Sequence, residues 1–147
     1  MGVIIMINQI KARHSTRRLM LTCAALCGML FTGTSYAKAA SFAPYTEAAF
    51  KAALANHTPM VIHIEASWCP VCKQQQAILD GLQRDPHYAT LEILDVDFDT
   101  QKPVVKQFGA TMQSTLIAYH DGQPAQRAVG VTSRSAITAL LNSAVGS

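Results

Sequence analysis

The sequence predicts an α/β fold in which a small mixed central sheet is covered by helices on both faces. Short apolar runs, typical of buried strands, alternate with segments whose apolar residues recur at helical spacing. This alternation predicts a pair of parallel strands joined by a right-handed crossover, the hand that nearly all such connections have. A closing hairpin around Asp121-Gly122 adds antiparallel strands to the same sheet.

The expected elements follow the chain order helix, strand, helix, strand, helix, strand, strand, helix. Their bounds are 47–56, 60–64, 70–84, 91–98, 102–108, 115–120, 125–131 and a last helix from 134 onward. Thr46 can cap the first helix, in which Phe50 and Leu54 lie one turn apart. The run after Pro59 is short and mostly apolar, as expected for a buried strand.

Prolines mark both ends of the helix 70–84. Pro70 suits the first turn of a helix, where its missing N–H costs nothing, and Asp85-Pro86 stops the helix. The residues expected to point inward are Ala77, Ile78 and Leu82.

Turn and cap residues define the elements of the C-terminal half. Gly109 ends the helix 102–108, and Asp121-Gly122 forms the tight turn between the last two strands. Ser133 can cap the last helix. Its apolar residues at helical spacing are Ile137, Leu140 and Leu141.

Residues 1–37 are interpreted as a signal peptide, and residues 38–147 as a single domain. Arg17-Arg18 ends a basic segment, and the 13 residues 19–31 are uncharged and mostly apolar. Ser35 and Ala37 then offer a cleavage site to a signal peptidase. Because roughly 20 residues are needed to span a bilayer, an uncleaved membrane anchor is the less favoured alternative. We therefore expect the protein to be exported.

The positive charge of the chain is concentrated in this leader. The whole chain has a net charge of +3 and a pI of about 8.8. From Lys38 onward the chain has eight basic and nine acidic side chains, which gives a net charge of −1. This balance excludes a polyanion-binding surface, so no nucleic-acid partner is expected. The hydrophobic fraction of 50% excludes a disordered chain.

Cleavage would leave two cysteines, Cys69 and Cys72, because Cys23 and Cys27 belong to the leader. In an oxidising compartment such a pair forms a disulfide unless something reduces it. The pair lies where a predicted strand turns into a predicted helix, and the free N–H groups of a helix start favour a thiolate at Cys69. Cys69 is then the attacking nucleophile, and Cys72, one turn further in and more protected, the resolving thiol.

A metal or organic cofactor is not expected. A structural zinc site needs four ligands, and the domain has no second cysteine pair to supply them. Asp95, Asp97 and Asp99 alternate along a predicted strand, but no EF-hand glycine or glutamate follows them. We interpret them as a solvated strand end.

With the Trp68-Cys69-Pro70-Val71-Cys72 motif in this order of elements, the chain resembles the periplasmic thiol–disulfide oxidoreductases of the thioredoxin family. The resemblance covers roughly residues 42–145 and includes Ser114-Thr115, the Asp121-Gly122 turn and Gly130. It implies the thioredoxin fold, the periplasm as the compartment of the exported protein, protein substrates that bear disulfides or thiols, and a role in cell redox homeostasis. It also implies a membrane electron donor of the cytochrome-biogenesis type, and we expect a monomer.

Three positions depart from the family pattern, and one of them is Glu65, which stands where many thioredoxins have an aromatic residue. Ser114 stands where the family has a cis-proline against the disulfide, so the Gln113–Ser114 bond is expected to be trans. His63 stands where thioredoxins bury an aspartate that accepts a proton from the second cysteine. A neutral imidazole can accept that proton near neutral pH, and an ordinary buried histidine is the alternative of equal weight. The resemblance places the substrate groove at Trp68, Pro70, Gln113, Ser114 and Thr115.

The resemblance favours a reductase, with a structural disulfide as the least favoured interpretation. Two functional alternatives stay open. Pro70 after the first cysteine resembles oxidases and glutaredoxins, so the pair could act as an oxidant instead. The same two thiolates, near Ser114, could carry Cu(I) or Zn without catalysis.

Overall fold

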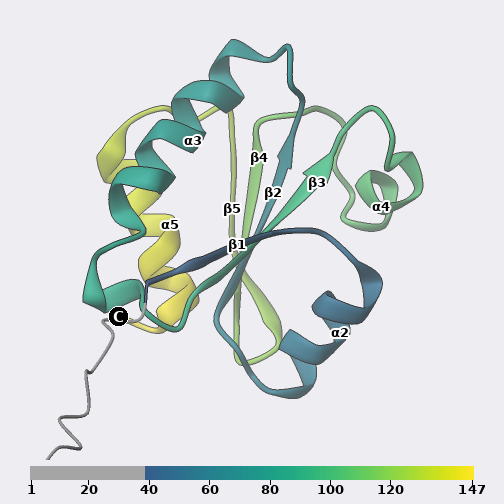
Figure 1. The fold of residues 1–147 in the computed structure, drawn as a ribbon. Helices are drawn as coiled ribbons and strands as arrows, with labels where there is room; N and C mark the ends of the chain where they lie inside the picture. The colour runs from purple at the N-terminus through teal and green to yellow at the C-terminus, as the bar shows by residue number, and fades with distance from the viewer. Residues whose placement is uncertain (1–38) are drawn as a thin grey trace, which may run out of the picture. The chain divides into compact units, whose positions relative to one another are not determined.

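The computed structural model describes residues 39–147, so the predicted leader with Cys23 and Cys27 lies outside the described residues. Figure 1 shows the fold. In chain order the elements are β1 (Ser41–Pro44), α2 (Glu47–Ala55), β2 (Met60–Glu65), α3 (Pro70–Leu82), the 3-10 helix η1 (Pro86–Tyr88), β3 (Glu92–Asp97), α4 (Lys102–Gln107), β4 (Thr115–His120), β5 (Gln123–Val129) and α5 (Arg134–Val145). Within this part of the chain, no helix is both long enough and apolar enough to cross a membrane.

The strands form one mixed sheet in the order β1-β3-β2-β4-β5. β3 pairs in parallel with β1 and β2, whereas β4 pairs antiparallel with β2 and β5. The predicted hairpin turn is present: Asp121 and Gly122 have φ values of +48° and +75°, as a two-residue turn between twisted strands requires. The predicted α/β architecture is thus confirmed.

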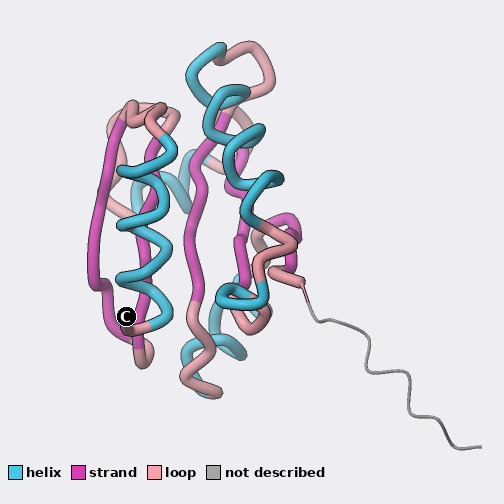
Figure 2. The backbone as a smooth tube through the Cα atoms, turned by 90° about the vertical axis from the view of Figure 1, so that its left-hand side faces the viewer, coloured by secondary structure: helices cyan, strands magenta, loops and turns pink. Residues whose placement is uncertain are grey.

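Helices cover both faces of the sheet, as predicted. Figure 1 shows α3 and α5 on one face and α2 and α4 on the other, and in Figure 2 α3 and α5 lie in front of the sheet. Side chains alternate along the central strand β2. Val61 belongs to the core beneath α3 and α5, and Ile62 to the core beneath α2 and α4. The same alternation aims His63 toward α3.

The face that α3 turns inward differs from the prediction. Its buried residues are Cys72, Gln75, Leu79 and Leu82. The predicted inward orientation is right for Leu82 and for Ile78, which is half-buried against the core, but wrong for Ala77, which is exposed. The other buried residues follow Cys72 at intervals of three, seven and ten, which places them on one face of the helix. Ala77 lies on the opposite face.

Strand β1 was not predicted from the sequence. It is four residues long, it ends at Pro44, and its two outer residues are exposed. Its backbone nevertheless pairs with β3 over all four residues, which makes it the edge of the sheet. So short a segment carries too little alternation to be recognised as a strand.

Candidate active site

Cys69 and Cys72 form a disulfide at the start of α3, with 5.3 Å between their Cα atoms. Cys69 is the N-cap of the helix, and its Sγ accepts a hydrogen bond of 3.1 Å from the backbone N–H of Cys72. Pro70 occupies the first turn, where its missing N–H leaves no bond unmade. A negative charge on the Cys69 sulfur would therefore be stabilised by the helix N-terminus.

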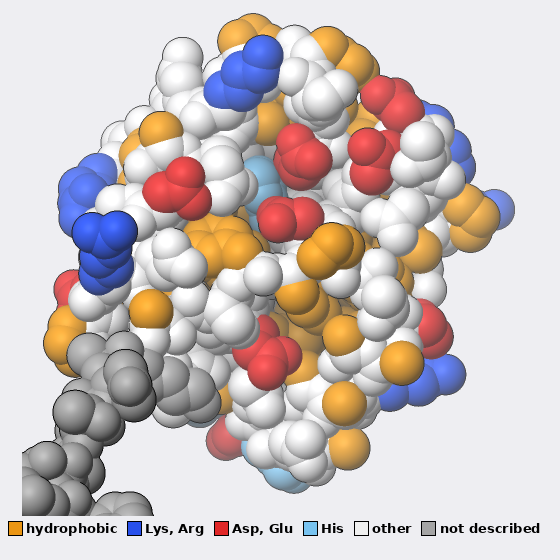
Figure 3. Space-filling view, viewed as in Figure 1, with side chains coloured by type: hydrophobic (Ala, Val, Ile, Leu, Met, Phe, Trp, Pro, Cys, Tyr) orange, Lys and Arg blue, Asp and Glu red, His pale blue; other side chains and the backbone are white. Residues whose placement is uncertain are grey.

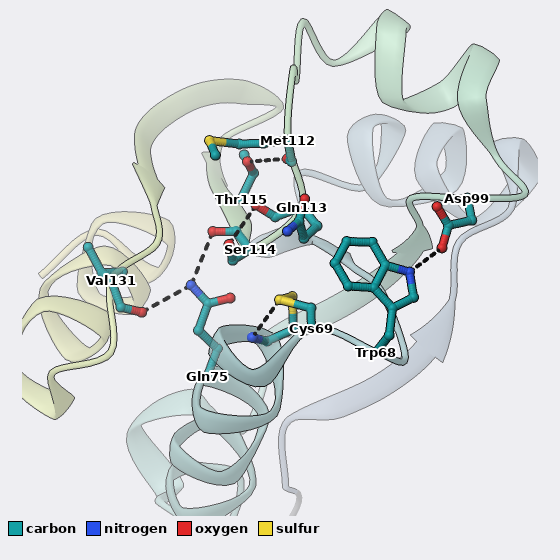
Figure 4. Close-up of a disulfide and its surroundings, with 10 residues drawn as sticks. Trp68, Cys69, Gln75, Asp99, Met112, Gln113, Ser114, Thr115 and Val131 are labelled. Atoms are coloured by element: carbon teal, nitrogen blue, oxygen red, sulfur yellow. Dashed lines mark hydrogen bonds between the residues drawn. A yellow bond between two sulfur atoms is a disulfide. The ribbon is translucent and has the colours of Figure 1, made fainter.

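Both cysteines are buried in the disulfide form. Their exposed fractions are 1% for Cys69 and 2% for Cys72, so the expected difference in protection between them is not present in this form. Trp68, by contrast, is 58% exposed, and its indole N–H donates a hydrogen bond of 2.7 Å to Asp99. Met112 is also exposed, and Figure 4 shows these two side chains on the segments that flank the disulfide.

The loop before β4 contains no cis peptide bond, so the Gln113–Ser114 bond is trans as expected. Ser114 instead has a φ of +56°, in the left-handed region that residues other than glycine seldom adopt. The Ser114 hydroxyl donates to the carbonyl of Gln113 at 2.6 Å, and the Thr115 hydroxyl donates to the carbonyl of Met112 at 2.9 Å. Local hydrogen bonds thus hold the turn that a cis-proline would otherwise form.

Gln75 ties this loop to the active-site helix, a role that the sequence analysis missed. Its side chain is fully buried, and its Nε2 donates to the carbonyls of Ser114 at 3.2 Å and Val131 at 3.0 Å (Figure 4). The Ser114 carbonyl also accepts the N–H of Gly130 at 2.9 Å. An amide at an inward position one turn after Cys72 was the signal available in the sequence.

His63 lies in β2, the strand that leads into α3, and it is buried, with an exposed fraction of 1%. Its Nδ1 lies 3.0 Å from Oδ1 of Asp95, the residue opposite it in the parallel register of β2 and β3. Its Nε2 has no hydrogen-bond partner among residues 39–147. Asp95 keeps 30% of its side chain exposed, as expected for a solvated strand end, but the register also brings it against a buried imidazole, a contact that the sequence did not predict.

Comparison with known proteins agrees with this geometry. Residues 41–143 match the family model described as Thioredoxin. The chain belongs to the thioredoxin family. It is 29% identical to the thioredoxin of Mycobacterium tuberculosis over 101 residues, which cover 68% of this chain and 86% of that protein. It is 30% identical to the thioredoxin of Chlamydia muridarum over 83 residues, which cover 56% of this chain and 79% of that protein.

A solved structure gives the same result. The crystal structure of Trxlp from Edwardsiella tarda superimposes with a TM-score of 0.67 and 44% sequence identity, covering 69% of this chain and 98% of that one. The thioredoxin fold predicted from the sequence is confirmed, and the chain is a thioredoxin-like thiol–disulfide oxidoreductase.

A hollow of about 290 Å³ opens beside the redox pair of this thioredoxin-family domain. Its lining includes Glu65, Cys72, Lys73 and Asp95, and Figure 3 shows acidic side chains gathered around a depression on this face. Burial raises the pKa of Glu65, and the nearby carboxylates of Asp95 and Asp97 raise it further, against the opposing effect of His63. The hollow gives the buried end of the site an opening to solvent.

The three alternating aspartates have separate partners. Asp97 accepts hydrogen bonds from the hydroxyl and N–H of Thr100, which lower the pKa of its carboxyl, whereas Asp99 accepts the indole N–H of Trp68. Asp95 is bonded to His63. Among residues 39–147 no group of three or more His, Cys, Asp or Glu side chains is arranged to hold a metal ion.

Proposed function

We propose that the protein is an exported protein-disulfide reductase in which Cys69 attacks and Cys72 resolves. The observation that carries this proposal is the disulfide at the N-terminus of α3, flanked by the exposed side chains of Trp68 and Met112. The names of the relatives, which are thioredoxins, support the reducing direction. The basic and apolar pattern of residues 1–37 supports export to the periplasm.

The proposed reaction is a two-step thiol–disulfide exchange. The Cys69 thiolate attacks one sulfur of a substrate disulfide, forms a mixed disulfide and releases the other substrate sulfur as a thiolate, which takes a proton from solvent. The Cys72 thiolate then attacks the Cys69 sulfur, which restores the Cys69–Cys72 disulfide and releases the second substrate sulfur as a thiolate, which takes a proton from solvent. A dithiol of a membrane electron carrier would reduce the pair for the next cycle.

We assign the proton of the Cys72 thiol to His63. Asp95 can accept the Nδ1–H of His63, and this tautomer leaves the unpartnered Nε2 with the lone pair that accepts a proton. The hollow lined by Cys72 and Asp95 provides the exit to solvent. This arrangement supports a histidine–aspartate pair in the place of the buried aspartate of thioredoxins.

The proposed substrate groove runs along Trp68, Pro70 and Gln113. The side chains of Ser114 and Thr115, which the sequence also places there, are buried, with exposed fractions of 6% and 1%. The Ser114 carbonyl already accepts two hydrogen bonds, so it is not available to a substrate backbone. Among residues 39–147 the Gln113 carbonyl accepts only the hydroxyl of Ser114, which can rotate away. Gln113 is therefore the residue of the loop that we expect to pair with a bound chain.

The reduction of insulin disulfides by dithiothreitol tests the two cysteine roles. Wild-type protein should accelerate the reaction, and Cys69→Ser should reduce the rate to that of dithiothreitol alone, because the attacking thiolate is gone. Cys72→Ser should accumulate a mixed disulfide on Cys69, detectable by mass spectrometry. Full activity in Cys69→Ser would refute the proposal.

Separate measurements test direction, export and donor. A reduction potential of about −270 mV would support a reductase, and a value near −120 mV would make the protein an oxidant. After expression of the full chain, N-terminal sequencing of protein recovered from the periplasm should begin at residue 38. Thiol trapping in cells should show a reduced pair that becomes oxidised when the membrane carrier is deleted.

A further inference from the structure

Gln75 has one polar atom without a partner next to the redox pair. The side chain is fully buried, and it lies three residues after Cys72, so the two side chains share one face of α3. Both hydrogens of its Nε2 are used by the carbonyls of Ser114 and Val131. Its Oε1 has no hydrogen-bond partner in the part of the chain that the structure describes.

The orientation of this amide is fixed by its neighbours. A carbonyl oxygen can only accept, so a flipped amide would place Oε1 against the oxygens of Ser114 and Val131. Oε1 therefore stays on the other side of the amide, which in Figure 4 is the side of the disulfide. A disulfide has no hydrogen to donate, and a buried acceptor without a donor is costly.

We propose that Gln75 is a positioning residue that shifts the redox equilibrium of the pair toward the dithiol. Reduction by a dithiol breaks the Cys69–Cys72 bond, and each sulfur gains one electron and one proton while the donor becomes a disulfide. In the resting dithiol the new S–H of Cys72 donates a hydrogen bond to Oε1 of Gln75, and it turns to Nε2 of His63 only in the resolving step. This bond stabilises the reduced form and has no counterpart in the oxidised form, so it raises the reduction potential.

The inference rests on the proposed redox cycle of the pair, but on neither its direction nor its substrate. The two bonds of Nε2 do not involve the cysteines, so they are available in both redox states and hold the amide in place. Their loss would weaken both forms alike. Of the hydrogen bonds that Gln75 makes, only the one to Oε1 distinguishes the dithiol from the disulfide.

The test is equilibration of the pair in dithiothreitol redox buffers. Gln75→Met and Gln75→Leu, two apolar replacements of different shape, are measured in parallel, so that one folded variant suffices. The equilibrium constant for reduction should fall about tenfold, which corresponds to about 30 mV toward more negative potential. Gln74→Met is the matched control, because Gln74 is the exposed neighbour on the same helix, and it should leave the constant unchanged.

A rescue variant and a second readout separate this effect from loss of structure. In Gln75→Glu, burial favours the protonated carboxyl, which keeps a carbonyl acceptor, and the constant should stay within twofold of wild type. Urea unfolding of both redox forms should show that Gln75→Met weakens the dithiol form more than the disulfide form, by the same tenfold factor.

Two failures remain distinguishable. If dithiothreitol does not reduce the wild-type pair reversibly, the proposed function fails. If the wild-type pair is reduced and reoxidised reversibly but the apolar variants keep the wild-type equilibrium constant within twofold, the proposed function stands. Oε1 would then be equally stabilised in the dithiol and in the disulfide form. That second result would overturn the role of Gln75.

Discussion

The core beneath α2 and α4 and the buried region around the disulfide are built from opposite kinds of side chain. Beneath α2 and α4, four aromatic rings contact one another with centroids 5.3–5.9 Å apart: Tyr45, Phe50, Phe108 and Tyr119. The buried polar residues of the described chain are His63, Gln75, Ser114 and Thr115. They lie in β2, in α3 and at the start of β4, around the redox pair.

The aromatic region therefore serves mainly stability, whereas the polar region holds the groups suited to the chemistry. Burying apolar rings is favourable without further conditions, whereas a buried polar atom is costly unless it is paired. In residues 39–147 the buried side-chain atoms without a partner are His63 Nε2 and Gln75 Oε1, both on residues of the polar region. We infer that the unpaired polar atoms lower the stability of this region, and that they are retained because of their proposed roles in thiol–disulfide chemistry.

Phe50→Ala should break the aromatic region with the largest effect on stability. Phe50 contacts the rings of three other aromatic residues, so its truncation should lower the free energy of unfolding by about 3–5 kcal/mol. The rate of disulfide exchange per folded molecule should not change. Urea unfolding measures the stability, and the insulin assay measures the rate per folded molecule. A clear fall in that rate would show that the aromatic region also serves the chemistry.

His63→Leu should show the opposite behaviour in the polar region. Loss of the proton acceptor should slow the exchange reaction by about 10²-fold, the lower end of the usual range for general base catalysis. The free energy of unfolding should change by about 1 kcal/mol or less, because an apolar side chain replaces one with an unpaired buried atom.

Asp95→Asn is the companion variant for His63→Leu. It keeps an acceptor for Nδ1 but removes the charge, so it should slow the reaction less than His63→Leu does, as measured in the same insulin assay. An unchanged rate in His63→Leu would identify His63 as an ordinary buried histidine.

The same contrast explains how much the sequence can predict. Apolar periodicity and caps are local, so they place α2, β2, α5 and the disulfide at the start of α3 correctly. The sequence predicts the exposure of Asp95 but not its contact with His63, because that contact depends on the register between two strands. The helical spacing of Gln75 from Ile78 and Leu82 indicates its inward position, but the sequence does not show its partners, which come from loops 39 and 56 residues away.

Two neighbouring carboxylates test the polar region at its rim, with the smallest expected effects. Glu65 and Asp97 face each other in the register of β2 and β3, yet their pKa values move in opposite directions. Burial raises the pKa of Glu65 above its ordinary value of 4.5, whereas hydrogen bonds from Thr100 lower the pKa of Asp97 below 3.8. The first shift favours the protonated form in the folded state and the second favours the charged form.

The signs of the two effects on stability follow from proton linkage. As the pH rises from 4.5 through the raised pKa of Glu65, the folded state holds a proton that the unfolded state has lost, so stability falls. Glu65→Gln should remove this loss and raise the free energy of unfolding at pH 7 by up to about 0.5 kcal/mol, a surface-sized effect because solvent screens this side chain. Asp97→Asn should lower stability at pH 7, and the difference from wild type should vanish as the pH falls through the lowered pKa. Urea unfolding at intervals between pH 3 and pH 7 measures the stability of both variants. If the two substitutions changed the free energy of unfolding at pH 7 in the same direction, the opposite effects of burial on Glu65 and of hydrogen bonding on Asp97 would be refuted.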